Sequence, residues 1–338
     1  STISKPSLHF NTKLYTGNGN DDTAITGINF QPDLVWIKAR SQATYDHMVF
    51  DSVRGQYKVI RTNLTNADST DTSGVKSFDT DGFTTNLGGY TNGNGVTFAS
   101  WNWKANGSGS ANTDGSINST VSANTTAGFS IVSYTGTGAN ATVGHGLGAV
   151  PKMIIIKELN NATNWIVYHT GVGNGGSLQL NTTIGTDTDS TFWNSTTPTS
   201  SVFTLGSNGN SNGSSDNYIA YCFAEKKGFS KFGSYTGNGN ADGSFIYTGF
   251  APSFVIMKRT DNTGAWYTLD NKRPTYNPKD KYLSPDSSNA ESTFTFWDFL
   301  SNGFKIRNTG TENNASGGNY IYMAFAEEPL VANVGASI

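Results

Sequence analysis

The stretch YTGNGN at residues 15–20 decides the fold, because it recurs as YTGTGAN at 134–140 and again as YTGNGN at 235–240. Each copy is followed by a proline and an apolar run that ends in lysine: QPDLVWIK to Lys38, VPKMIIIK to Lys157 and APSFVIMK to Lys258. The tyrosine, the proline and the lysine all advance by 119 and then by 101 residues. Three markers that keep this spacing twice indicate a tandem triplication of one unit of roughly 100 residues.

Within each copy the residue types favour strands and turns. The Pro-led run predicts a central strand buried on both faces, since a proline at the first residue of a strand costs no ladder hydrogen bond. Glycine and asparagine favour the connections, whereas threonine, tyrosine and phenylalanine favour strands. We therefore expect an all-β protein of three tandem β-sandwich repeat domains of jelly-roll kind, each with its own core. The centres of the runs, Val35, Ile155 and Ile256, should be fully buried.

The repeat boundaries and the composition between them predict the domain organisation. A stretch of small polar residues, rich in Gly, Ser and Asn, follows the first copy and is typical of a linker. The expected segments are a first repeat at 1–104, the linker at 105–127, a second repeat at 128–226, a third at 227–328 and a C-terminal tail at 329–338.

Composition excludes several classes of protein. Aromatic residues make up 12% of the chain and its net charge is only −3, so it is not disordered. A pI of about 5.8 gives no basic footprint for nucleic-acid binding. No apolar run approaches the ~18 residues of a membrane-spanning helix, so no membrane insertion is expected. The single cysteine, Cys222, excludes an internal disulfide and is expected to be a buried strand thiol.

A search for reactive constellations finds none that is specific. The chain has no Gly-x-Ser-x-Gly elbow, and its four histidines stand one by one without metal-ligand spacing. The acidic clusters at 21–22, 68–71 and 187–189 resemble oxygen-rich cation loops, but Asp and Asn also bond their own backbone in turns. We expect no catalytic residue, no metal and no cofactor, with a bound calcium ion as the alternative at those loops.

Three long strings carry a resemblance to a known family: residues 112–157, residues 220–243 (AYCFAEKKGFSKFGSYTGNGNADG) and residues 320–333 (YIYMAFAEEPLVAN). The first of them runs from NTDGSINST to PKMIIIK. They resemble a repeat family of virion appendage proteins, often called tail-fibre-like, in tailed bacteriophages that include many marine phages. The resemblance implies a non-enzymatic structural protein on the external surface of the virion.

The same resemblance leaves several roles open. The leading expectation is a tail fibre or receptor-binding appendage that contacts other virion subunits and a host surface glycan. The alternatives are a capsid decoration or head-fibre protein, a tail-borne polysaccharide depolymerase and a bacterial surface adhesin. Analogy with other appendages favours a homo-oligomer, a trimer above all.

Contact with partners should reside in the excursions that differ between the copies. The third excursion, NKRPTYNPKDKYLSPD at 271–286, combines four basic residues with three prolines that stiffen it and two tyrosines. We expect it to bind an anionic partner, either a host glycan or an acidic face of a neighbouring virion subunit. The predicted contact residues are Lys272, Arg273, Tyr276, Lys279, Lys281 and Tyr282, together with Trp193 in the second excursion.

Overall fold

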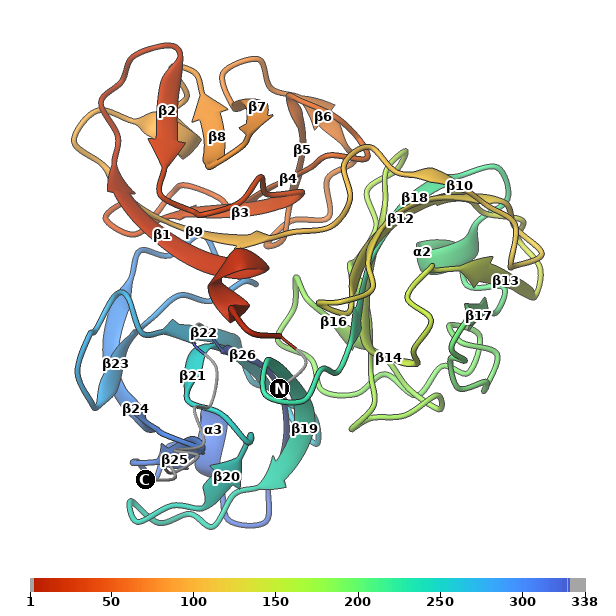
Figure 1. Cartoon of the computed structure of the whole chain (residues 1–338). Helices are drawn as coiled ribbons and strands as arrows, with labels where there is room; N and C mark the ends of the chain where they lie inside the picture. The colour runs from red at the N-terminus through yellow and green to blue at the C-terminus, as the bar shows by residue number, and fades with distance from the viewer. Residues whose placement is uncertain (1–2, 327, 329–338) are drawn as a thin grey trace, which may run out of the picture.

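The computed structural model describes residues 3–326 and 328, and it confirms the all-β expectation. Strands hold 43% of the residues and helices 5%. The strands form antiparallel sheets grouped in three lobes, one for each copy of the repeat, which meet around a common centre (Figure 1). The expected C-terminal tail at 329–338 lies outside the described residues.

The first lobe is formed by the elements from η1 to β9. It contains η1 (Pro6–Leu8), β1 (Phe10–Thr16), β2 (Thr23–Thr26), β3 (Leu34–Ala39), β4 (Met48–Asp51), β5 (Lys58–Arg61), β6 (Ser69–Thr70), β7 (Val75–Asp79), β8 (Gly82–Thr85), α1 (Gly89–Asn92) and β9 (Thr97–Trp103). A six-stranded sheet in the order β1-β9-β3-β4-β5-β6 faces the centre, and a three-stranded sheet, β2-β8-β7, covers it on the outside.

The second lobe is formed by the elements from β10 to β18. It contains β10 (Ser110–Asn112), β11 (Ser119–Asn124), β12 (Phe129–Thr135), β13 (Ala141–Gly144), β14 (Pro151–Glu158), β15 (Ile166–His169), β16 (Leu178–Gln179), β17 (Val202–Leu205), α2 (Gly209–Asn212) and β18 (Asn217–Ala224). Its sheets have the orders β10-β11-β12-β18-β14-β15-β16 and β13-β17.

The linker predicted at 105–127 is not a free connection, so that boundary is wrong. Strand β11 pairs with β12 along its whole length, from Ser119↔Tyr134 to Asn124↔Phe129, and β10 pairs with β11. Serine and threonine satisfy a sheet ladder as well as larger residues do, and Val121 gives the strand one buried apolar anchor. The small polar composition therefore belongs to two strands added at one side of the second lobe's larger sheet, with β10 at its edge.

The third lobe is formed by the elements from β19 to β26. It contains β19 (Ser230–Thr236), β20 (Phe245–Tyr247), β21 (Pro252–Arg259), β22 (Trp266–Asp270), β23 (Lys279–Tyr282), β24 (Ser292–Leu300), β25 (Gly303–Ile306), α3 (Thr311–Asn314) and β26 (Asn319–Ala326). Two four-stranded sheets, β19-β26-β21-β22 and β20-β25-β24-β23, make up the lobe.

The repeated Pro-led runs form the expected central strands. Pro151 and Pro252 open β14 and β21, whereas β3 begins two residues after Pro32. The centres of the runs are buried as predicted, with exposed fractions of 0% for Val35, 4% for Ile155 and 0% for Ile256.

The two faces of each central strand are buried by two different clusters of side chains. On β21, Val255 and Met257 face the third lobe's own core, whereas Phe254 and Ile256 belong to a cluster shared by all three lobes. The shared cluster is aromatic at its middle. Phe325 of β26 lies between rings of every lobe, with centroid distances of 5.1 Å to Phe10, 5.9 Å to Trp103 and 6.1 Å to Phe223. The expectation of three separate cores is thus incomplete, because the lobes also share a fourth.

Candidate functional site

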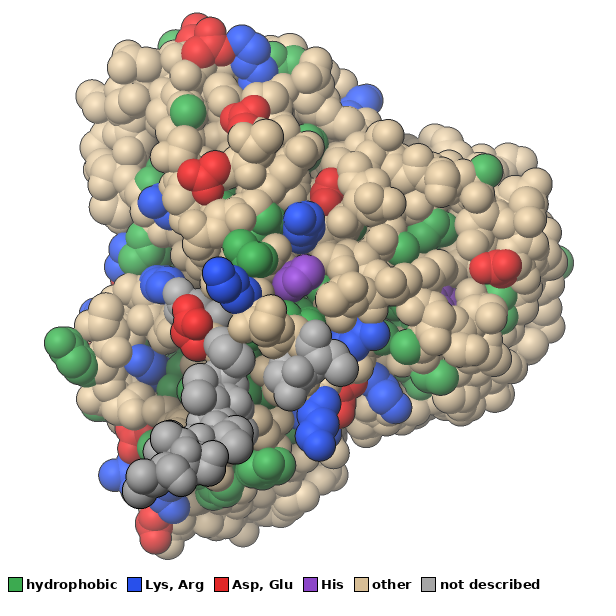
Figure 2. Space-filling model, in the orientation of Figure 1, with side chains coloured by type: hydrophobic (Ala, Val, Ile, Leu, Met, Phe, Trp, Pro, Cys, Tyr) green, Lys and Arg blue, Asp and Glu red, His purple; other side chains and the backbone are tan. Residues whose placement is uncertain are grey.

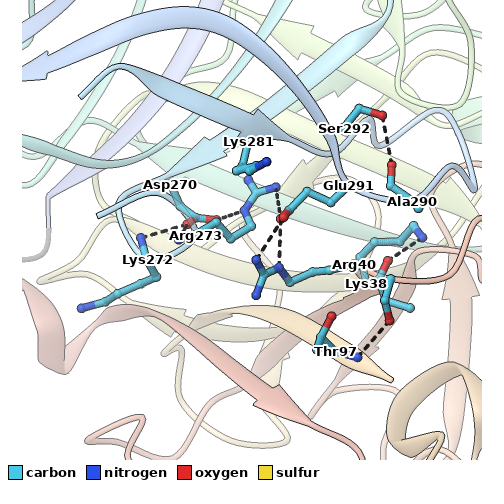
Figure 3. Close-up of polar contacts among 12 residues, drawn as sticks. Lys38, Arg40, Thr97, Asp270, Lys272, Arg273, Lys281, Ala290, Glu291 and Ser292 are labelled. Carbon is cyan, nitrogen blue, oxygen red and sulfur yellow. Dashed lines mark hydrogen bonds and ion pairs between the residues drawn. The ribbon is translucent and has the colours of Figure 1, made fainter. Parts of the chain in front are cut away.

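The third excursion lies where the third lobe meets the first, and the structure buries part of it in that junction (Figure 3). Arg273 has no exposed side-chain surface, and its Nε lies 2.7 Å from Asp270 Oδ2. Its Nη2 donates to the backbone oxygen of Thr268 at 2.7 Å, and the guanidinium lies 5.6 Å from the ring centroid of Trp101 in the first lobe. Arg273 therefore holds two lobes together, and its prediction as an external contact is wrong.

The ion pair extends across the junction through Glu291. This carboxylate lies 3.6 Å from Arg273 and accepts from both Nε and Nη2 of Arg40 in the first lobe, at 2.9 and 3.0 Å. Its backbone N–H also donates to the backbone oxygen of Arg40 at 2.8 Å. Burial alone would raise the pKa of Asp270, but the adjacent Arg273 more than offsets it and lowers that pKa. The junction thus contains a network of ion pairs and hydrogen bonds that joins the third lobe to the first.

Lys279 is also withdrawn from the surface. It is 3% exposed, and its Nζ donates to the backbone oxygens of Pro274, Thr275 and Tyr276 at 2.9 to 3.4 Å. Burial lowers the pKa of its amine. The prediction of Lys279 as an external contact is wrong, because its amine is buried and binds three backbone oxygens of its own loop.

Lys272 and Lys281 keep part of their side chains in solvent. Lys281 Nζ donates to Thr293 on the neighbouring strand. Lys272 lies at the edge of an open hollow of about 380 Å³ that it shares with Lys13 and Asn29 of the first lobe. The four basic residues of the excursion therefore do not form one exposed cluster.

The predicted aromatic contacts likewise include both exposed and buried side chains. Tyr276 is 85% exposed, whereas Tyr282 is half-buried and packs against Phe296 with a centroid distance of 5.2 Å. Trp193 is 1% exposed, packs edge-on against Tyr168 and donates to the backbone oxygen of Gly176 at 3.2 Å. Its excursion folds back onto the second lobe, so the prediction of Trp193 as a ligand contact is wrong.

The last residue of each of the strands β4, β15 and β22 links one lobe to the next. This role was not predicted from the sequence. Asp51 of the first lobe accepts from Tyr221 Oη of the second at 2.8 Å, and Asp270 of the third accepts from Trp101 Nε1 of the first at 3.1 Å. At the remaining junction, His169 Nε2 lies 3.0 Å from the backbone oxygen of Tyr322. The three contacts run in one cyclic sense, so the chain closes into a ring. The available signal was the repeated position of these residues after each second apolar strand.

The junction between the first and second lobes contains the same pairing of arginine with aspartate as the junction between the third and first lobes. Arg54 lies 2.6 Å from Asp51 and 3.0 Å from Asp68, and its side chain is only 4% exposed. Among residues 3–326 and 328, the junction between the second and third lobes has no arginine paired with the residue that ends the second apolar strand. There, burial lowers the pKa of His169 to about 4, so the imidazole is neutral.

A buried asparagine holds the YTG turn of each lobe, and its hydrogen bonds explain the motif that is repeated in the sequence. Asn314, in α3, accepts from the backbone N–H of Asn238 at 2.9 Å and donates to the backbone oxygens of Asn240 and Asn308 at 2.8 and 2.7 Å. Asn92 and Asn212 make equivalent bonds in the other lobes. The glycine of each YTG is also fixed, since a Cβ there would lie 2.2 to 2.3 Å from a backbone oxygen.

The lysines that close the three central strands are buried. Lys38, Lys157 and Lys258 are all 0% exposed, and each Nζ donates to the backbone oxygen of the next residue at 2.7 to 2.8 Å. Burial lowers the pKa of each amine to about 8. Lys258 also donates to the backbone oxygen of Thr183 in the second lobe at 3.2 Å.

The titratable groups do not assemble into a reactive centre in the described part of the chain. His145 accepts from the backbone N–H of Leu147 at 3.2 Å, as a histidine in a turn does. Within residues 3–326 and 328, no three His, Cys, Asp or Glu side chains lie close enough together to hold a metal ion. Over the same residues no helix has the length and apolarity needed to cross a membrane. Charged side chains are scattered over the face seen in Figure 2, which is mostly uncharged.

Comparison with known proteins gives a family without a described function. The model named "Domain of unknown function (DUF7483)" matches residues 5–329. Neither the curated proteins nor the solved structures yield a match to the chain.

Proposed function

We propose that this chain, which belongs to the DUF7483 family, is a non-enzymatic structural protein on the external surface of a tailed-phage virion, where it contacts the host. The phage assignment rests on the resemblance of the three quoted strings. The observation that carries the structural role is the ring: three copies of one unit close head to tail within a single chain.

The proposal includes the finer description of the fold. Each lobe is interpreted as one β-sandwich of jelly-roll kind, with the central strand of its inner sheet packed against the shared core. Such a body is stiffened at two junctions by buried ion pairs and at the middle by stacked aromatic rings. Rigidity of this kind suits a part that bears load outside a cell without disulfides.

The ring also favours a second candidate, a capsid decoration or head-fibre protein. Three similar lobes around one centre have threefold pseudosymmetry. A chain of this symmetry could bind on a threefold axis of a capsid or to another trimeric virion protein. In this proposal a single chain supplies the symmetry, and a homotrimer remains a further proposal about how such rings assemble with other virion subunits.

Whole particles provide the test. Purified virions from a host that carries the gene should contain the chain by mass spectrometry, and antibody-gold labelling should place it on the outside of the particle. Label on the tail supports the appendage, and label on the head supports decoration. A chain that is abundant in the lysate but missing from purified particles contradicts both. Release of oligosaccharides from host capsule by the pure protein would contradict the non-enzymatic role.

A further inference from the structure

The third lobe carries several of the large apolar side chains that are exposed in the described part of the chain. Tyr276 is 85% exposed, Tyr247 62%, Phe245 44% and Leu300 37%. Large apolar side chains in contiguous exposure are informative, because soluble proteins rarely leave such patches without a use. We call these four residues the aromatic platform.

Three of its residues belong to β20 and β24 of the outer sheet, which lies on the side of the third lobe away from the common centre (Figure 1). Tyr247 pairs with Gly303, and Gly303 pairs with Leu300, so a single row crosses β20, β25 and β24. Gly303, in the middle of this row, is buried, and a Cβ there would lie 2.1 Å from the backbone oxygen of Ile246. The ring of Phe245 lies directly beside the same glycine.

Tyr276 joins the row from the loop before β23, and that loop is rigid. The side chain of the following residue, Asn277, donates to the backbone oxygen of Phe299 at 2.8 Å and accepts from its N–H at 2.9 Å. These bonds fix the loop beside Leu300. Lys279 binds the backbone oxygen of Tyr276 from inside the loop. An exposed ring on a fixed loop loses little entropy when it binds a ligand.

The equivalent positions in the other lobes show that the fold does not require these rings. The buried residue of each outer edge strand pairs with Phe83, Phe203 or Phe304, which aligns Ile25, Val143 and Ile246. The flanking residues are then Ala24 and Thr26 in the first lobe, and Thr142 and Gly144 in the second. Only the third lobe has aromatic residues there, Phe245 and Tyr247.

The residues around the platform favour a carbohydrate over a protein partner. The row next to Tyr247, Gly303 and Leu300 is ionic: Phe245 pairs with Lys305, and Lys305 with Asp298. Lys305 lies 2.8 Å from Asp242, and Arg307 lies 3.2 Å from Asp298. Protein interfaces exclude charge from their centre. A sugar ring instead offers an apolar C–H face to an aromatic ring and hydroxyls to adjacent polar groups.

We infer that the aromatic platform binds a neutral saccharide, with the sugar ring against Tyr247 and Phe245 and with Tyr276 on one side. Neutrality follows from the paired charges, two cations and two anions, and from the burial of Arg273 and Lys279. The inference deepens the proposed host contact and replaces the anionic glycan expected from the sequence.

The probe is a panel of neutral gluco-, galacto- and manno-hexasaccharides, with a sialylated hexasaccharide as the charged member, measured by calorimetry on the full chain. We expect binding to at least one neutral member. Tyr247→Ser and Tyr276→Ser should each weaken it about tenfold or more, and Tyr247→Phe should retain most of it.

The matched controls are Leu87→Ser and Ile184→Ser, which remove exposed apolar side chains from the first and second lobes and should leave affinity unchanged. Circular dichroism checks that every variant is folded. Absence of binding across the neutral panel, equal loss in the controls, or preference for the sialylated member would each overturn the inference. These measurements use the pure chain, so their result is independent of whether the chain is found in virions.

Discussion

At the scale of single residues, the buried asparagines explain why the YTG motif is repeated. Each tyrosine packs in the same register, with Tyr15 against Phe98, Tyr134 against Tyr218 and Tyr235 against Tyr320. Its hydroxyl donates to the short helix that carries the asparagine, as Tyr235 does to the backbone oxygen of Asn313 at 2.9 Å. The turn, the helix and the closing strand are therefore fixed by a few polar atoms.

Removing one of these asparagines should be costly. Asn314→Ala removes the donor of the Asn308 backbone oxygen in a buried site and of the Asn240 backbone oxygen in a partly buried one, so we expect a loss of about 1–3 kcal/mol in the free energy of unfolding. Urea titration measures the loss. Asn289→Ala, in an exposed loop, is the control and should change stability by less than about 0.5 kcal/mol. Equal stabilities of the two variants would show that the side-chain bonds of Asn314 contribute nothing.

The buried lysines predict a dependence of stability on pH. The folded pKa of Lys38, Lys157 and Lys258 is about 8, below the unfolded value of about 10.4. Between these values the unfolded chain binds more protons, so the contribution of these lysines to the free energy of unfolding should rise with pH from about 8 to about 10.4 and be constant below about 8. Chemical denaturation at intervals between pH 7 and 9.5 measures this slope.

The matched variant changes the three lysines together to methionine, which keeps the length of the side chain and removes the charge. Its stability should lose the rise above pH 8, whereas Lys227→Met, at an exposed position, should keep it. A wild-type curve that falls between pH 8 and 9.5 would contradict the lowered pKa values.

At the scale of elements, the loops after β4 and β22 hold neighbouring lobes together. Arg273→Ala leaves the buried carboxylate of Asp270 unpaired, for which we expect a cost of about 3–5 kcal/mol. The double variant Asp270→Asn with Arg273→Met removes both charges and should recover part of that loss. Denaturant unfolding compares them, with Lys76→Ala as the control, because it removes an exposed ion pair with Asp22 and should change stability far less than Arg273→Ala does. A double variant that is less stable than Arg273→Ala would refute the uncompensated charge as the cause.

The same loops show what could be predicted from the sequence and what could not. The strand class, the repeat and the burial of Val35, Ile155 and Ile256 follow from periodicity and spacing, which are local properties. The role of Arg273 depends on Asp270 three residues away and on Arg40 and Glu291, which lie far apart in the chain. A basic residue in a polar, proline-rich segment has the same local pattern whether it faces solvent or another lobe. For the same reason the burial of Trp193 was not visible, whereas the exposure of Tyr276 agreed with its stiff loop.

At the scale of the whole molecule, the ring makes the three lobes depend on one another. The inner sheet of each lobe buries one face in its own core and the other in the shared cluster. A lobe that opened alone would expose the aromatic residues of the cluster and break two junctions. The short connection between β18 and β19, at 225–229, further restricts how far the second and third lobes can separate.

The chain should therefore unfold in one transition common to all lobes, although three repeats with separate cores would show more than one. Phe325→Ala removes the ring that contacts Phe10, Trp103 and Phe223, and we expect a loss of about 3–5 kcal/mol that is felt in every lobe. Hydrogen exchange followed by mass spectrometry reports on β9, β18 and β26 separately, and protection should fall in all three. Phe203→Ala, in the second lobe's own core, is the matched control, because its added local exchange should be largest in the second lobe. If Phe325→Ala raised exchange in the third lobe alone, the lobes would be independent domains in contact, and the ring would have no role in stability.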